Sequence, residues 1–328
     1  DRIQEENGSL RTRQIPLTRE VMVPVKGLAE SGRVNWLRDP RDWFDMRIPD
    51  AFALVHEPAV ETLPEGAGYL LPATPDGEGV YATFEFTEQV VGWPCFTVDA
   101  PEGAIVEMMV QESHADDGPA WMDTHFFAWT RFICREGINH FEPFDYESFR
   151  WVQLHVRNAS RPVRILKMEA RRRLYDWPNP VQVQCADAAL QRLFDATTNT
   201  LNNSAIDVVV DGMGRERQQY SGDCGPQLFA IRYGFGDALL PARFLRTFSE
   251  GLTPDGYFLD CWPAFDRLAR VMQKQVQAAH WGPILDHGIG FIFDCWNHYL
   301  ETGDRDAVAE AYPRLARFAA YLESIRGA

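Results

Sequence analysis

One short segment of the chain, DGMGRERQQYSGD, concentrates the charge that acid catalysis needs. Asp211 and Asp223 lie at its two ends, and Glu216 lies between Arg215 and Arg217. Cleaving a glycosidic bond requires a proton donor for the departing oxygen and a second carboxylate that acts as base or nucleophile. The residue types and their spacing therefore suggest acid chemistry on a sugar, with Glu216 as the proton donor.

A glutamic acid donates a proton near neutral pH only where its surroundings disfavour the charged form, and neighbouring carboxylates have that effect. Adjacent guanidinium groups have the opposite effect. We therefore expect Asp211 and Asp223 to dominate the field at Glu216, with Arg215 and Arg217 turned toward other partners.

The same segment could be charged simply because it is a solvated loop. Its glycines favour irregular backbone, which fits either interpretation. Its flanks, VVV before and LFAIRYGFG after, are strongly apolar, so both ends are expected to be anchored in a core. Tyr220 lies between Glu216 and Asp223, and an aromatic face can stack on a sugar ring. These features favour a carbohydrate site.

Composition limits the classes of partner. The chain has 328 residues, of which 45% are hydrophobic and 24% are charged, and its formal net charge is −15. Such an acidic surface repels phosphate backbones, so nucleic acid is not expected as a partner. No apolar stretch reaches the roughly 18 residues of a membrane span. The first residues are polar and do not resemble a signal peptide, which leaves a cytoplasmic and a mature secreted or periplasmic protein equally open.

The pattern of cysteines and glycines does not suggest a cofactor. The six cysteines are widely scattered, without CxxC pairs or Cys/His metal spacing, which predicts free thiols. The chain also lacks a glycine-rich phosphate loop and a nucleophile elbow. We therefore expect neither a metal nor another cofactor.

Two halves of the chain differ in hydrophobic period. Between about residues 33 and 173, apolar residues alternate with polar ones in YATFEF, AIVEMMVQES and RWVQLHVRN, as in strands buried on one face. Several such strands joined by turns, one of them DAPEG, predict a jelly-roll-like β-sandwich. The segment DWPNP then marks a boundary, because two prolines interrupt regular structure.

After this boundary the apolar residues recur at helical spacing, which predicts helical hairpins. We expect their apolar stripes to form core. One stripe comprises Leu190, Leu193, Phe194, Thr197 and Leu201, and later ones comprise Phe291, Ile292, Trp296, Tyr299 and Leu300, and Val308, Tyr312, Leu315 and Phe318. The predicted domains are an N-terminal arm or end of a preceding domain (1–32), a β-sandwich (33–176) and a helical domain (177–328).

Two further segments carry candidate pocket residues. In TPDGYFLDCWPAFD, Trp262 is either a sugar platform or a loop anchor. In AHWGPILDHGIGF, Trp281 is a second candidate platform. Asp286 and His287 could line a pocket there, or Asp286 could simply favour a helix N-terminus.

The charged segment resembles the signature loop of the family 78 glycoside hydrolases, the α-L-rhamnosidases. Asp211, Glu216 and Asp223 match the offsets of that loop's first aspartate, its glutamate and its last aspartate. Three longer segments also resemble the family: FDYESFRWVQL, CADAALQRLFDATTNTLNNS and CWNHYLETGDRDAVAEAYPRLARFAAYL. The resemblance spans about residue 81 to the C-terminus. It implies that the predicted helices are the first part of an (α/α)6 barrel.

The resemblance also implies roles for individual residues. Glu216 would be the general acid of an inverting exo-glycosidase, and the general base is expected from residues beyond Ala328. The resemblance makes Asp211, Arg215, Tyr220 and Asp223 contacts of the sugar, and we add Trp262 and Trp281 from the other two segments as residues expected to bind it. Gly212-Met213 and Gln218-Gln219-Tyr220 replace Cys-Pro and Leu-Gly-Trp of the family's loop, which affects the expected sugar specificity more than the acid.

Three functions remain open from the sequence. The first is hydrolysis of terminal α-L-rhamnosides or a related sugar by an enzyme without a cofactor. This enzyme could form a homo-oligomer. The second is a polysaccharide lyase or an unsaturated-glucuronyl hydrolase, since these also use helical barrels with acidic pockets. The third is a non-catalytic fragment that binds carbohydrate or assembles with another chain.

Overall fold

The computed structural model describes residues 12–37, 52–55, 57–75, 77–114, 129–214, 216–263 and 284–326. The chain divides into two compact units, which are described separately. One is Glu20–Arg173, and the other combines Asp1–Arg19 with Leu174–Ala328.

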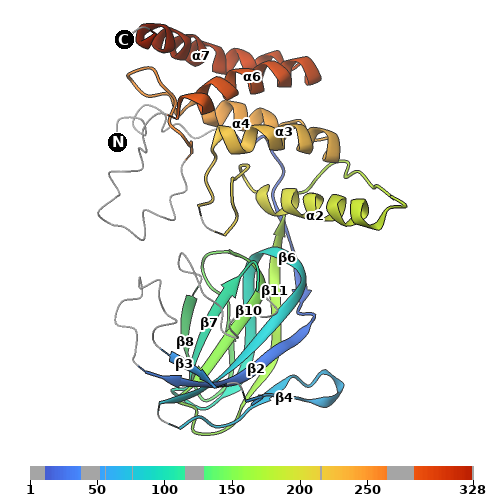
Figure 1. Ribbon diagram of the computed structural model, residues 1–328, viewed down its shortest axis with the longest axis vertical. Helices are drawn as coiled ribbons and strands as arrows, with labels where there is room; N and C mark the ends of the chain where they lie inside the picture. The colour runs from blue at the N-terminus through green and yellow to red at the C-terminus, as the bar shows by residue number, and fades with distance from the viewer. Residues whose placement is uncertain are drawn as a thin grey trace. The chain divides into compact units, whose positions relative to one another are not determined.

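The first unit is an antiparallel β structure (Figure 1). Its central path of hydrogen-bonded strands runs β4-β5-β11-β6-β10-β7-β8, while β1 pairs with β11, β2 with β3 and β6, and β9 with β6. The strands are β1 (Arg19–Pro24), β2 (Gly27–Trp36), β3 (Phe52–Val55), β4 (Glu61–Thr62), β5 (Tyr69–Leu71), β6 (Glu78–Ala100), β7 (Ile105–Gln111), β8 (Trp129–Ile133), β9 (Gly137–Phe141), β10 (Glu147–Arg157) and β11 (Val163–Leu174), with a 3-10 turn, η2 (Pro64–Gly66). The sheet thus begins before the predicted residue 33, and it ends close to the predicted boundary at 176.

The long strand β6 organises this unit because its two halves pair with different neighbours. Residues 78–92 pair with β2 and β10, whereas residues 92–100 pair with β9 and β11. Gly92 lies at the change of partner, and a Cβ there would come within 2.2 Å of the Arg171 carbonyl oxygen. A residue with a side chain could not occupy this position without moving β11.

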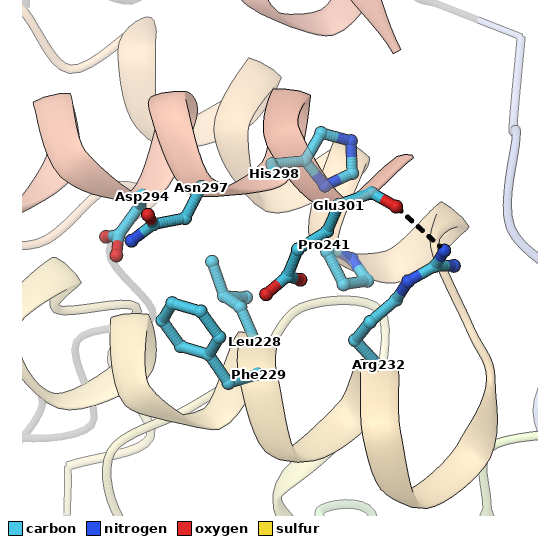
Figure 2. Close-up of a pocket in the computed structure, with 8 residues that line it drawn as sticks. All are labelled: Leu228, Phe229, Arg232, Pro241, Asp294, Asn297, His298 and Glu301. Carbon is cyan, nitrogen blue, oxygen red and sulfur yellow. Dashed lines mark hydrogen bonds between the residues drawn. The ribbon is translucent and has the colours of Figure 1, made fainter. Parts of the chain in front are cut away.

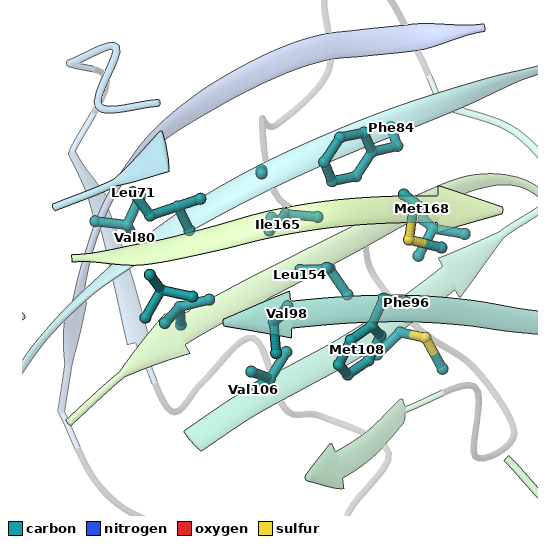
Figure 3. Packing of buried hydrophobic residues seen from close by; sticks show 14 of the residues in the cluster. Leu71, Val80, Phe84, Phe96, Val98, Val106, Met108, Leu154, Ile165 and Met168 are labelled. Atoms are coloured by element: carbon teal, nitrogen blue, oxygen red, sulfur yellow. The ribbon is translucent and has the colours of Figure 1, made fainter. Parts of the chain in front are cut away.

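The alternation read from the sequence is confirmed on the apolar face of the strands. Residues from β6, β7, β10 and β11 pack into one cluster, which includes Phe84, Val106, Leu154 and Ile165 (Figure 3). These four side chains are fully buried. Burial of side chains of this size contributes roughly 1.5–3 kcal/mol each, so the cluster is the main source of stability in this unit.

The prediction that the opposite face of these strands is solvated is wrong at several positions. Thr83, Glu107, Gln153 and His155 are fully buried. Gln153 Nε2 donates to Thr83 Oγ1 at 2.7 Å, and Gln153 Oε1 lies 2.8 Å from His155 Nε2. Arg131 Nε donates to Glu107 Oε1 at 2.7 Å. Mutual hydrogen bonding of this kind is what makes burial of polar side chains tolerable.

Burial of His155 predicts acid sensitivity of the fold. Burial lowers the pKa of His155 to about 3 from 6.5, so the folded protein keeps this side chain neutral while the unfolded chain takes up a proton below pH 6.5. The contribution of His155 to the free energy of unfolding is therefore at its maximum above pH 6.5, and it decreases as the pH falls below this value. Between pH 6.5 and 4.5 we expect a loss on the order of 2–3 kcal/mol.

Urea unfolding at pH 7.5, 5.5 and 4.5 measures this loss. His155→Gln does not titrate and should show a flatter pH dependence than the parent. His140→Gln, at an exposed position, is the control. Equal pH dependence in the parent and in His155→Gln would contradict the prediction.

The second unit is helical (Figure 1). Its described helices are α2 (Ala188–Ser204), α3 (Ser221–Phe235), α4 (Leu239–Ser249), α6 (Leu285–Thr302) and α7 (Arg305–Ile325). Asp187 caps α2 by accepting hydrogen bonds from two backbone amides, and Asp304 caps α7 in the same way. Gly303, with φ of 70°, ends α6, as the Gly-Asp pair predicts. Helix α3 packs on α6, and α4 packs on α7.

An aromatic cluster joins four segments of this unit. It comprises Phe244 and Phe248 from α4, Phe258 from the following loop, Phe291 from α6 and Phe318 from α7, all at most 2% exposed. Ring centroids of Phe291 lie 4.8 Å from Phe248 and 5.3 Å from Phe258. The cluster fixes the positions of α4, α6 and α7 relative to one another.

The helices were predicted correctly, but the prediction that their apolar stripes form core is wrong in part. On α2, Leu190 and Leu193 are 56% and 60% exposed. On α6, Trp296 and Leu300 are also largely exposed, because the buried face of this helix runs through Gly288, Phe291, Cys295 and His298. Residues 291, 292, 296, 299 and 300 spread over more than one side of the helix, so hydrophobicity alone did not identify the packed side.

All six cysteines are free thiols, and Cys134, Cys224, Cys261 and Cys295 are buried. Within the described residues, helices that combine the length and the apolar character of a bilayer span do not occur.

Candidate active site

The loop between α2 and α3, Ala205–Tyr220, is called the acid loop below because it carries Glu216. Its two sides are bonded across a narrow turn: Asp211 N donates to the Gln218 carbonyl at 2.9 Å, and Gln218 N donates to Asp211 Oδ1 at 2.8 Å. These bonds place Glu216 inside the turn, with only 9% of its surface exposed. The predicted glutamate is therefore held in a defined, sheltered position.

Arg217 stabilises this turn from within. It is 1% exposed and adopts a left-handed conformation with φ of 59°, which is uncommon for a residue with a side chain. Its backbone N donates to the Gly212 carbonyl at 3.0 Å, and its Nε donates to the Met213 carbonyl at 2.7 Å. Backbone strain of this kind persists only where surrounding contacts hold it, and functional sites are common places for it.

The three predicted carboxylates come together. Asp211 has a raised pKa, first because of its burial and then because the charges of Glu216 and Asp223 repel its own. Asp223 is exposed in the first turn of α3, where the helix dipole favours a negative charge. One half-buried and one exposed aspartate therefore flank Glu216 in the chain, and Asp211 interacts electrostatically with both Glu216 and Asp223.

Tyr220 contacts Glu216 directly. Its hydroxyl donates to Glu216 Oε2 at 2.8 Å, and its side chain is only 8% exposed. Burial, followed by the hydrogen bond to Glu216, raises the pKa of Tyr220 well above its ordinary value. The phenol is therefore a neutral donor to the carboxyl group. Its predicted role as a wall of the sugar subsite stays a prediction.

A second loop, Gly251–Pro263, pairs with the acid loop. Tyr220 and Cys261 form an antiparallel bridge, and Trp262 N donates to the Gln219 carbonyl at 3.2 Å. Gln219 Nε2 donates back to the Trp262 carbonyl at 2.6 Å. Trp262 is thereby fixed by its backbone next to the acid loop, and its side chain is partly exposed.

This pairing also places Asp260 of the second loop close to Tyr220. Asp260 is 1% exposed, burial raises its pKa, and its Oδ1 accepts from Cys261 N at 3.0 Å. Within the described part of the chain, its Oδ2 has no hydrogen-bond partner. Its nearness to Tyr220 depends on the pairing of two loops about forty residues apart, which local sequence patterns do not reveal.

The first turn of α6 completes the site. His287 Nδ1 lies 3.3 Å from the Asp260 carbonyl oxygen, and the imidazole lies edge-on to Tyr220 with ring centroids 5.9 Å apart. Asp286 is exposed in the same turn. The structure thus separates the two candidates: His287 lies against the acid loop, whereas Asp286 occupies the helix-terminal position. The predicted residues Arg215 and Trp281 lie outside the described residues.

A separate shallow hollow lies between α3, α4 and α6 (Figure 2). It is lined by Leu228, Phe229, Arg232, Pro241, Asp294, Asn297, His298 and Glu301. Burial raises the pKa of Asp294 to about 7 from 3.8. Among the described residues, Asp294 Oδ2 has no hydrogen-bond partner. Among the residues that line this hollow, none belongs to the acid loop.

Asp294 is expected to weaken the fold as pH rises. Between about pH 4 and 7 the folded state retains the proton that the unfolded chain releases, so stability falls across this range and stays low above it. Asp294→Asn should therefore be more stable than the parent at pH 8 by ~1–3 kcal/mol, and nearly equal to it at pH 4. Thermal unfolding at both pH values tests this, with the exposed Asp255→Asn as control. A gain of equal size at both pH values would contradict it.

Comparison with known protein families identifies two matching domains in this chain. Residues 179–327 match the bacterial alpha-L-rhamnosidase 6 hairpin glycosidase domain, and residues 75–171 match the bacterial alpha-L-rhamnosidase concanavalin-like domain. The sequence matches no curated protein at a significant level. The two matched domains confirm the predicted fold class, a β-sandwich followed by helical hairpins.

Solved structures show the same fold. A GH78 rhamnosidase of Bacillus sp. GL1 superposes with a TM-score of 0.69 at 23% identity, over 84% of this chain and 28% of that one. A rhamnosidase from Klebsiella oxytoca with rhamnose bound gives 0.69 at 17% identity, over 98% and 59%. A Streptomyces avermitilis α-L-rhamnosidase complexed with L-rhamnose gives 0.58 at 20% identity, over 84% and 27%. This chain therefore spans only part of the length of each.

Proposed function

This chain is a member of the bacterial α-L-rhamnosidase family, and on that premise we propose that the full-length protein hydrolyses terminal α-L-rhamnosides with inversion, using Glu216 as general acid. The acid loop is the observation that carries the proposal. It shelters Glu216 from solvent, and its Asp211 interacts electrostatically with Glu216 and with Asp223 in the first turn of α3. Two of the similar solved structures contain rhamnose, which supports this sugar as the substrate.

In the proposed reaction, Glu216 transfers its proton to the glycosidic oxygen while the bond from that oxygen to the anomeric carbon breaks. A water molecule, deprotonated by a separate carboxylate, adds to the opposite face of the same carbon. Asp211 and Asp223 accept hydrogen bonds from sugar hydroxyls. The carboxylate that acts as general base stays a prediction.

The pocket around the sugar is assigned from the sequence and the loop pairing together. Trp262, fixed by the backbone pairing of the second loop, is a platform for the sugar ring, and Tyr220 borders the same site. Arg215 and Trp281 are proposed as further contacts on the basis of the sequence. The matches to hydrolase domains favour this function over a lyase on a similar barrel.

The test is the reaction itself. Full-length protein is incubated with an aryl α-L-rhamnoside and, in parallel, with the corresponding α-D-mannoside, and the products are followed by proton NMR. We expect rhamnose to be released first as the β-anomer, with little release of mannose. Initial release of the α-anomer would contradict inversion, no release would contradict the function, and a product with a new ultraviolet-absorbing double bond would indicate a lyase.

A further inference from the structure

Tyr220 holds the Glu216 side chain through a hydrogen bond that is sheltered from solvent. The Tyr220 hydroxyl donates to Glu216 Oε2 at 2.8 Å, and both residues are at most 9% exposed. A hydrogen bond is electrostatically stronger where water is excluded. Such a bond restricts the directions in which the Glu216 carboxyl group can point.

The Tyr220 ring is itself held from two sides. Its backbone pairs with Cys261 of the second loop and directly precedes α3. Its ring meets His287 of α6 edge-on, with an interplanar angle of 81° and centroids 5.9 Å apart. Edge-to-face geometry is one of the favoured arrangements of ring pairs. The position of the phenol therefore depends on His287.

His287 is fixed in turn by α3 and by the second loop. Ser221 Oγ donates to the His287 carbonyl at 2.5 Å, and His287 Nδ1 lies 3.3 Å from the Asp260 carbonyl oxygen. Gly222 faces the imidazole so closely that a Cβ there would come within 2.4 Å of His287 Nε2. The site requires glycine at this position if the ring is to stay where it is.

From these contacts we propose that Tyr220 and His287 are positioning residues for Glu216, a role that rests on the proposed function. His287 holds the Tyr220 ring, and the Tyr220 hydroxyl holds the carboxyl group that protonates the leaving group. These contacts begin with His287 in the first turn of α6, so the position of that helix controls the orientation of the Glu216 carboxyl group. Neither residue is required to touch the substrate for this role.

Two variants disrupt the contacts from His287 through Tyr220 to Glu216 at different points. Tyr220→Phe removes the hydroxyl and keeps the ring, and Gly222→Ala forces the His287 ring to move while leaving His287, Tyr220 and Glu216 in the chain. Their matched controls are Tyr233→Phe, at a 71% exposed position, and Gly234→Ala, where an added Cβ meets nothing within 4 Å. Both controls lie on α3 and should leave the kinetics unchanged.

The readout compares two substrates of the full-length protein. A methyl α-L-rhamnoside needs its leaving group protonated, whereas a 2,4-dinitrophenyl α-L-rhamnoside does not. For Tyr220→Phe we expect kcat on the methyl rhamnoside to fall about ten-fold, the equivalent of one hydrogen bond, with KM and the dinitrophenyl rate nearly unchanged. Gly222→Ala should likewise lower kcat on the methyl rhamnoside and leave the dinitrophenyl rate nearly unchanged.

Equal losses on both substrates, or no loss on either, would overturn the positioning role. If kcat on the methyl rhamnoside falls selectively in Tyr220→Phe but not in Gly222→Ala, His287 has no part in the positioning role. If the parent protein cleaves neither substrate, or if Glu216→Gln retains full activity on the methyl rhamnoside, the proposed function fails and this inference fails with it. Circular dichroism of each variant confirms that the helical unit is folded.

Discussion

Replacing Glu216 with glutamine is expected to lower kcat on an alkyl α-L-rhamnoside by about 10²–10⁴-fold, the usual contribution of a positioned general acid. Glutamine has nearly the same shape and can still accept from Tyr220, but it has no proton to donate to the glycosidic oxygen. Substrate binding should change little, so the loss is expected in kcat rather than in KM. Steady-state kinetics of the full-length protein measure both constants.

The control for this substitution is Glu323→Gln. The Glu323 side chain is 73% exposed near the end of α7, and the same chemical change there should leave turnover unchanged. A Glu216→Gln variant with a raised KM and an unchanged kcat would contradict the assignment, because it would make Glu216 a binding group.

Truncation of Phe291 to alanine is expected to lower the free energy of unfolding of the helical unit by ~3–5 kcal/mol. Phe291 is fully buried, and its ring meets Phe244, Phe248 and Phe258 of the aromatic cluster. Alanine would leave a cavity where α4 and α6 meet. Domains of this size are stable by only about 5–15 kcal/mol, so this one change removes a large share.

The matched control lies two residues along the same helix. Phe293 is 60% exposed, and Phe293→Ala removes the same ring without opening a cavity. Urea unfolding followed by circular dichroism at 222 nm compares the two variants. Similar, small losses in both would contradict the packing described for α6.

The nearness of the three carboxylates could be predicted from the sequence because it depends on local spacing. Asp211, Glu216 and Asp223 lie on one loop and the turn that follows it, so their offsets already bring them near each other. The alternation in strands such as Glu147–Arg157 and the caps at Asp304 and Gly303 are local in the same sense. Patterns within one element were therefore sufficient to predict the elements and the acid loop.

Contacts between distant segments could not be predicted in this way. The bridge from Tyr220 to Cys261, and the approach of His287 to Gly222, depend on how two loops and two helices pack. Hydrophobicity was also misleading where helices have apolar residues on more than one side. Trp296 was predicted as core and is exposed, while the less hydrophobic His298 on the same helix is buried.

The burial of polar side chains was missed for a related reason. His155 and Gln153 alternate with apolar residues of β10 and were expected to be solvated, yet both are fully covered. A period of two identifies the two faces of a strand, but whether the polar face is covered depends on other segments. The acid sensitivity assigned to His155 therefore follows only from the structure.

The proposed mechanism requires Glu216 to protonate the leaving group, and a series of aryl α-L-rhamnosides with leaving groups of different acidity tests this directly. The parent protein should show a shallow dependence of kcat on leaving-group pKa. Glu216→Gln should show a steep one that approaches the parent at the most acidic phenol, because a good leaving group departs without a proton. Parallel lines for the two proteins would show that Glu216 is not the acid.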